Sequence, residues 1–166
     1  MSIIGLVGYA GSGKSTIARA LAKIIRPRPV IMSFAGVLKE KVAEALDVPL
    51  SYIEENKPMI RPLLVELGRT GRKVNPSMWI DYLDATRPRD LLTIIDDARY
   101  LNEIEYIAAH GGTVIYVGRT GVGPANDEEA KSIGEVMDTE PLFILNSSTP
   151  EAAAAKIIEL TKGATV

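Results

Sequence analysis

The chain has 166 residues, of which 46% are hydrophobic and 24% charged, and its formal net charge at pH 7 is −2. These values are typical of one soluble globular domain, and without a basic excess we expect no general attraction to nucleic acid. No cysteine is present, which excludes disulfides and thiolate metal ligands. No apolar run is long enough to span a membrane and the N-terminus lacks a signal-like pattern, so we expect a cytoplasmic protein.

The first predicted strand, Ile3–Val7, is followed by a glycine-rich loop and then by a helical pattern over Lys14–Ile25. The loop reads Gly8-Tyr9-Ala10-Gly11-Ser12-Gly13-Lys14-Ser15 and fits Gly-x4-Gly-Lys-Ser/Thr, the phosphate-binding P-loop. Its glycines allow a tight turn that directs backbone N–H groups at one anion, beside the positive end of the helix. We therefore predict that it binds a nucleoside triphosphate, with Lys14 acting on the β- and γ-phosphates and the Ser15 hydroxyl binding Mg²⁺. The nucleotide-binding residues of this segment are Gly8, Gly11, Ser12, Gly13, Lys14, Ser15 and Thr16.

Strand-like and helix-like patterns alternate along the chain, which predicts a single α/β domain over residues 1–166 with a parallel sheet and helices on both faces. The strand-like segments are Ile3–Val7, Pro29–Phe34, Leu91–Asp96, Thr113–Val117 and Leu142–Asn146. The helical segments are Lys14–Ile25, Ala35–Leu46, Ile60–Leu67, Ser77–Ala85, Asn102–Ala109 and Glu151–Thr161.

Two segments break this alternation: residues 35–90, which are mostly helical, and residues 119–141, which are rich in glycine and charge. Ligands of open parallel sheets bind outside the carboxyl ends of the strands, and both segments begin there. We expect both to cover a ligand on the P-loop, and surface decoration is the alternative for each. Because residues 119–141 contain several glycines and few large apolar side chains, we expect them to form a mobile lid.

The third predicted strand ends in two acids, Asp96 and Asp97, with Arg99 two residues further on. An acid in this position beside a P-loop holds Mg²⁺, usually through water, and we favour Asp96 for that task. A helix cap is the alternative role for one of the two acids. Arg99 is expected to clamp the transferring phosphates, and its alternative role is a surface ion pair with Glu103.

The helical segment over residues 35–90 also carries cations. Among these, arginine offers a planar fork for bidentate phosphate contacts. The cations are Lys57, Arg61, Arg69, Arg72 and Lys73. They suggest a second, phosphate-bearing substrate, and a solvated basic face is the alternative. Trp79 is expected either to stack on a base or to lie in the core. His110, the only histidine, is expected to cap the end of its helix.

Taken together, these residues resemble the bacteriophage-type deoxynucleoside monophosphate kinases, a branch of the P-loop nucleoside monophosphate kinases. The matching stretches are GYAGSGKST at Gly8–Thr16, SFAGVLKEKVAEAL at Ser33–Leu46, RPLLVELGRTGRKVNPSMW at Arg61–Trp79, IIDDARYLNEIEYI at Ile94–Ile107 and GGTVIYVGR at Gly111–Arg119. The resemblance implies a three-layer P-loop kinase fold with a five-stranded parallel sheet, a helical monophosphate-binding insertion and a short lid. It also implies ATP and Mg²⁺ as cofactors and, for a phage-encoded chain, the cytoplasm of a host cell.

The resemblance implies a role for individual residues as well. Catalysis falls to Lys14, Arg99, Asp97 and Arg69, and nucleotide binding extends to Arg119. Binding of the monophosphate substrate falls to Arg61, Arg72, Lys39, Trp79, Asp97, Asn102 and Glu103. Arg119 is the only arginine of the lid, so neutralisation of transition-state charge is assigned to Arg99, Arg69 or a partner subunit of a homodimer.

The sequence therefore predicts a kinase that moves the γ-phosphoryl group of ATP onto a (deoxy)nucleoside 5′-monophosphate. One alternative is a P-loop kinase of another small metabolite, of the shikimate or dephospho-coenzyme-A type. A non-catalytic nucleotide-binding switch is the other, and such a protein would need loops that respond to the γ-phosphate.

Overall fold

The structure, a computed structural model, describes residues 3–163 and divides the chain into two compact units. One unit comprises the chain up to Met32 together with the chain from Pro88 onward, and the other comprises Ser33–Arg87. We call them the sheet unit and the helical unit. The helical unit corresponds closely to the expected insertion over residues 35–90.

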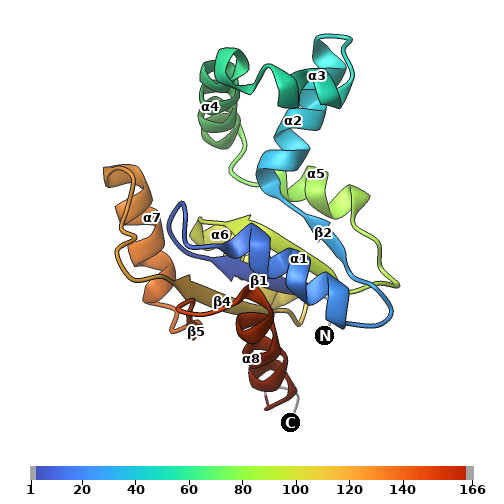
Figure 1. Cartoon of the computed structure of the whole chain (residues 1–166). Helices are drawn as coiled ribbons and strands as arrows, with labels where there is room; N and C mark the ends of the chain where they lie inside the picture. The colour runs from blue at the N-terminus through green and yellow to red at the C-terminus, as the bar shows by residue number, and fades with distance from the viewer. Residues whose placement is uncertain (1–2, 164–166) are drawn as a thin grey trace. The chain divides into compact units, whose positions relative to one another are not determined.

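The sheet unit is built on five parallel strands (Figure 1). The strands are β1 (Ile3–Val7), β2 (Val30–Met32), β3 (Thr93–Ala98), β4 (Thr113–Gly118) and β5 (Leu142–Leu145), in the order β2-β3-β1-β4-β5. The predicted five-stranded parallel sheet is therefore confirmed. Because all strands run the same way, their carboxyl ends meet at one edge, where the loops after β1, β3, β4 and β5 begin.

Helices cover both faces of this sheet. Helices α1 (Lys14–Ile24) and α8 (Pro150–Gly163) pack on one face, where Ile4 and Leu6 of β1 join a continuous apolar core with them. Helix α6 (Leu101–Ala109) covers the other face, and there Gly5 leaves room for the Ile107 side chain, which a Cβ would strike. The alternation of side chains along β1 thus produces the three layers.

The helical unit contains α2 (Phe34–Ala45), α3 (Leu50–Glu55), α4 (Lys57–Val74) and α5 (Met78–Thr86). Its small core is formed by buried apolar side chains from α2, α3 and α4, namely Val42, Ala43, Ile53, Ile60 and Leu64. Helix α2 begins at a Ser33 cap, whose side chain accepts a hydrogen bond from Gly36 N at 2.9 Å. The unit therefore has its own core and its own helix-start signal.

Two helices differ from the sequence prediction. Helix α4 is much longer than the predicted Ile60–Leu67 segment, because it continues through Gly68 and Gly71 and accommodates Pro62 in its interior. Helix α7 (Asp127–Met137) occupies the middle of the expected lid, and its Ile133 and Val136 are at most 1% exposed. The expectation that few large apolar side chains hold this segment is wrong for α7, because these two pack in the interior. Across residues 3–163 no helix combines the length and apolarity that a membrane span needs.

Candidate active site

The glycine-rich loop joins β1 to α1 in the conformation that the sequence predicts for a phosphate-binding loop. Gly8 has φ 143° and Gly13 has φ 99°, and residues other than glycine rarely adopt such backbone angles. A Cβ on Gly13 would also collide with the side-chain amide of Asn146. Gly13 precedes the first residue of α1, so the loop leads directly into the positive end of that helix.

Lys14 is buried inside this loop, with 7% of its surface exposed. Its ammonium donates to Gly8 O at 2.6 Å and to Tyr9 O at 2.8 Å. Burial, and next the nearby charge of Arg99, lower the pKa of Lys14 to about 8, although the Glu129, Asp97 and Asp96 carboxylates act in the opposite direction. A cation held this way, beside a second cation, is arranged to neutralise an anion at the loop.

Asp96 and Asp97 lie within β3, where the register against β1 is irregular. Gly5 pairs with Ile95 and Val7 pairs with Ala98, so two residues of β3 stand opposite Leu6 alone. This bulge turns the strand locally and places both half-buried acids near the loop, since both carboxylates act on the Lys14 pKa. The two acids therefore stay equivalent candidates for a metal.

Arg99 follows β3, and its surroundings differ from the alternative that the sequence suggested. The Glu103 carboxylate does not pair with its guanidinium but accepts the backbone N–H groups of Arg99 and Tyr100, at 2.8 and 3.2 Å. Glu103 is 2% exposed and completes a capping box at the start of α6, which corrects its prediction as a substrate-binding residue. Asn102, the second residue of α6, is half-buried beside it.

Glu129, which the sequence analysis did not select, is the anionic partner of Arg99. Its carboxylate lies 3.6 Å from an Arg99 guanidinium nitrogen and accepts Ala10 N of the P-loop at 3.1 Å. Asn126 and Glu129 stand three residues apart at the start of α7 and form a capping pattern, with Asn126 Oδ1 accepting Glu129 N at 2.9 Å. That spacing was a sequence signal for both the helix and the residue.

A cavity of about 430 Å³ opens beside the P-loop in the sheet unit. Its lining residues come from the P-loop, α1, the loops after β4 and β5 and the start of α8, namely Gly13, Thr16, Arg119, Thr120, Asn146, Ser147, Ser148 and Pro150. The structure thus brings the predicted nucleotide-binding residues Thr16 and Arg119 together, and Arg119 donates to Gly11 O at 3.3 Å. The volume lies in the range of small-molecule sites.

Asn146 is a second residue of this site that the sequence analysis missed. It follows β5, and its side-chain amide donates to Ser12 O at 2.8 Å, which fixes the loop from the neighbouring strand. Ser12 itself is 1% exposed. The signal that could have identified Asn146 is its position, a polar residue at the carboxyl end of a strand.

The predicted substrate-binding cations lie in the helical unit. Arg61 is exposed and Arg72 half-buried, and their separation of eleven positions along α4 places both within about 20° of each other around the helix. Arg69 is exposed on the same helix. Arg72 donates to Gly68 O at 3.1 Å, which holds its guanidinium along the helix. Lengthening of α4 beyond its predicted end is what brings these arginines onto one element.

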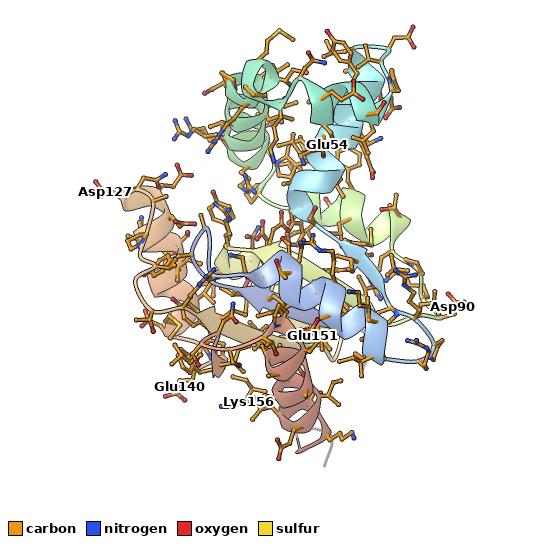
Figure 2. All side chains as sticks on the ribbon, in the orientation of Figure 1. Glu54, Asp90, Asp127, Glu140, Glu151 and Lys156 are labelled. Atoms are coloured by element: carbon orange, nitrogen blue, oxygen red, sulfur yellow. The ribbon has the colours of Figure 1, made fainter. Side chains whose placement is uncertain are left out.

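Two other predicted substrate-binding residues of the helical unit are occupied by contacts within it. Lys39 forms an ion pair with Glu54 at 2.6 Å, and this hydrogen bond lowers the pKa of Glu54, which Figure 2 labels. Trp79 is 4% exposed, and its indole N–H donates to Gly68 O at 3.2 Å. An indole enclosed in this way is a core side chain, which is the alternative role that the sequence suggested for Trp79. It offers no free face to a base. The stacking prediction for Trp79 is corrected accordingly.

The residues expected to hold Mg²⁺ fit that ion chemically. Ser15 is exposed at the start of α1, and Asp96 and Asp97 supply carboxylates on β3, all of them oxygen ligands of the kind Mg²⁺ prefers. The described residues contain no cluster of three or more His, Cys, Asp or Glu side chains suited to a metal. His110 ends α6 with Nδ1 2.8 Å from Tyr106 O, as its capping prediction required.

Comparison with known proteins identifies the family and the fold. Residues 4–120 match the family described as ATPase family associated with various cellular activities (AAA). Shikimate kinase from Aquifex aeolicus shares 15% identity at a TM-score of 0.58, with 97% of this chain and 96% of that chain covered. Shikimate kinase from Acinetobacter baumannii, in complex with shikimate, shares 15% identity at a TM-score of 0.56, with 100% of this chain and 96% of that chain covered. Shikimate kinase from Bacteroides thetaiotaomicron shares 15% identity at a TM-score of 0.56, with 97% of this chain and 98% of that chain covered. None of the curated proteins compared with the chain matches it.

Proposed function

This chain belongs to the AAA family of ATPases, and on that basis we propose that it transfers the γ-phosphoryl group of ATP to a (deoxy)nucleoside 5′-monophosphate. The observation that carries the choice of acceptor is the arginine face of α4, where Arg61 and Arg72 lie about three turns apart on one side of the helix. Planar guanidinium groups in such a row suit a phosphate-bearing acceptor better than a neutral one. The five sequence stretches that resemble nucleoside monophosphate kinases support the same choice.

The sheet unit supplies the ATP side of this reaction. The P-loop N–H groups and Lys14 hold the β- and γ-phosphates, while the cavity lined by Thr16 and Arg119 receives the nucleoside part. Asn146 keeps the loop in register through its bond to Ser12 O. Because these groups are already placed by hydrogen bonds within the protein, little reorganisation is needed at the moment of transfer.

The residues suited to Mg²⁺ are the Ser15 hydroxyl and one carboxylate of the β3 bulge, Asp96 or Asp97. Held by these residues, Mg²⁺ would supply positive charge against the negative charge that develops on the phosphates during transfer. Arg99, at the end of the same strand, adds a second positive charge beside Lys14. The chain thus offers cations and oxygen ligands at one edge of the sheet.

The chemistry balances without a general base. An oxygen of the acceptor phosphate attacks the γ-phosphorus, the bond from the γ-phosphorus to the β–γ bridging oxygen breaks, and ADP leaves with that electron pair. The acceptor oxygen is already ionised at neutral pH, so no proton has to be removed. This agrees with the absence of a histidine role at the site, since His110 is committed to the end of α6.

A second candidate is a kinase of another small metabolite, because the solved structures that share this fold include shikimate kinases. The arginine face of α4 favours the nucleotide acceptor over that candidate. A nucleotide-binding switch, or an ATPase that uses only water, is a further alternative. It would leave the cations of the helical unit without a task.

The test is a panel of acceptors incubated with ATP, Mg²⁺ and the purified chain, with ADP release as the readout. The panel contains the four deoxynucleoside and four ribonucleoside monophosphates, shikimate, dephospho-coenzyme A and no acceptor. We expect at least one monophosphate to raise ADP release at least ten-fold above the reaction without acceptor. Stimulation by shikimate or dephospho-coenzyme A alone would replace the proposal with the second candidate. Equal, slow release in every tube would identify an ATPase or a switch.

A further inference from the structure

Glu129 is a buried carboxylate that the proposed mechanism leaves without a task. Its side chain is 3% exposed and has three donor partners, of which Ala10 N belongs to the P-loop. One oxygen accepts Ala125 N at 2.7 Å, just before α7 begins at Asp127, which Figure 2 labels. The other oxygen faces the P-loop, 3.1 Å from Ala10 N and 3.6 Å from the Arg99 guanidinium.

The two oxygens therefore have separate tasks. One oxygen serves the start of α7, where it accepts the N–H of Ala125, the residue before the Asn126 cap. Capping does not account for the other, which meets a P-loop N–H and an arginine from a different part of the chain. A buried carboxylate at such a position needs a compensating contact, and Arg99 provides it.

The groups that meet this oxygen are those that would meet a phosphate. Ala10 belongs to the P-loop, and Arg99 is the cation proposed to clamp the transferring group. The charge of Arg99 also lowers the pKa of Lys14, second only to burial, so two cations lie close enough to repel each other. Cations that converge in this way require an anion, and Glu129 is the carboxylate with the largest opposing effect on that pKa.

We propose that Glu129 is an internal counter-anion of the P-loop, which takes the place of a terminal phosphate at Ala10 and Arg99 and yields both when the triphosphate binds. The inference rests on the nucleotide-binding part of the proposed function and not on the identity of the acceptor. It makes Glu129 a positioning residue that acts through Arg99. It also links the lid segment to the ligand, because α7 contacts the P-loop through this carboxylate.

A neighbouring carboxylate provides a matched control. Glu128 lies in the same first turn of α7, is exposed, and accepts the Tyr100 hydroxyl at 3.1 Å. Glu128→Gln and Glu129→Gln change the net charge equally. Glutamine at position 129 keeps a carbonyl oxygen that can accept Ala125 N or Ala10 N, but it removes the charge that holds Arg99.

The experiment measures Kd by calorimetry for the magnesium complexes of a non-hydrolysable ATP analogue with a β–γ imido bridge and of ADP. We expect Glu129→Gln to bind the triphosphate analogue roughly ten-fold more tightly than the unchanged chain, as for removal of one competing charge contact. The gain for ADP should be smaller, because ADP has no group in the place of the terminal phosphate. Glu128→Gln should leave both Kd values within about two-fold.

A second variant keeps the test decisive if the glutamine variant fails to fold. Glu129→Asp retains the charge but is one methylene shorter, so it cannot reach Ala125 N and Ala10 N together. We expect a gain in affinity for the triphosphate analogue between those of the unchanged chain and the glutamine variant.

Three results would overturn the inference. They are weaker binding of the triphosphate analogue by both Glu129 variants, equal effects of the changes at 128 and 129, and a gain as large for ADP as for the triphosphate. The first would make Glu129 a support that ATP binding needs. Failure of the proposed function is separable, because a chain that binds the triphosphate but phosphorylates no monophosphate loses its acceptor and keeps this counter-anion.

Discussion

The P-loop and helix α4 both gather positive charge, but they hold it in different ways. Lys14 is 7% exposed, is enclosed by carbonyls of its own loop, and has a pKa lowered to about 8. Arg61 stands exposed on α4, in a unit with a separate core. The enclosed cation is suited to a ligand that must be held in one geometry. The exposed guanidinium is suited to an acceptor that enters and leaves in every cycle.

The largest expected effect comes from removing the enclosed cation of the P-loop. Lys14→Ala should lower phosphoryl transfer by about 10²-fold or more while the fold persists, because a preorganised charge contact is lost and no core apolar side chain is. Steady-state kinetics and a thermal melt measure the two quantities. Lys156→Ala, an exposed lysine on α8 labelled in Figure 2, is the control and should be unaffected. Near-normal turnover by the folded Lys14 variant would refute the P-loop assignment.

The next largest effect is expected from removing the exposed cation on α4. Arg61→Ala should reduce kcat/KM for the monophosphate by roughly ten- to a hundred-fold, as for the loss of one charge-assisted contact, and should leave the Kd for ATP nearly unchanged. Arg28→Ala removes an equal charge from an exposed position in the sheet unit, outside α4, and serves as the control. Equal weakening for ATP and for the acceptor would place Arg61 outside the acceptor site.

A further prediction concerns the pH dependence of nucleotide binding. In the chain without nucleotide the pKa of Lys14 is about 8. Because a bound triphosphate raises this pKa, binding above pH 8 must take up a proton. Affinity for the imido analogue of ATP should therefore be independent of Lys14 ionisation below pH 8 and fall by up to about ten-fold per pH unit above it. The charged groups that set this pKa are Arg99, Glu129, Asp97 and Asp96.

Lys14→Arg provides the control for that titration, because arginine stays charged throughout the range. Its affinity, whatever its absolute value, should not fall between pH 8 and 9.5. A fall of the same steepness in both proteins would assign the titration to another group.

The smallest expected effect concerns the lid. Amides between residues 119 and 126 should gain protection from hydrogen exchange when both nucleotides bind, since no helix or strand holds this segment. Amides near Ile133 and Val136 should already be protected, because both side chains are buried in α7. Protection of residues 119–126 before binding, or no gain after it, would show that the segment does not close.

Sequence reasoning predicted the parts of this molecule that depend on local pattern. The apolar run of β1, the glycine loop and the helical spacing of α1 have local causes, and the structure places all three as expected. The His110 cap followed from the same logic. The parallel sheet followed from the alternation of elements, because parallel strands need helical crossovers.

Sequence reasoning was incomplete where side-chain contacts within the fold decide. Trp79 and Glu103 were assigned to the substrate, but both are buried: Trp79 donates to Gly68 O, and Glu103 accepts backbone N–H groups in a local capping box. Glu129 and Asn146 were missed because their partners, Ala10 and Ser12, lie more than a hundred residues away in the chain. Only the fold brings such pairs together, although the Asn126–Glu129 capping pattern was visible in the sequence.

The most direct test of the central claim is identification of the product by ³¹P NMR after incubation with ATP, Mg²⁺ and the best monophosphate. The proposed transfer requires the nucleoside diphosphate and ADP to appear in equal amounts, with negligible inorganic phosphate. Inorganic phosphate formed in proportion to ADP, without a nucleoside diphosphate, would contradict it, because water and not a bound phosphate would then be the acceptor.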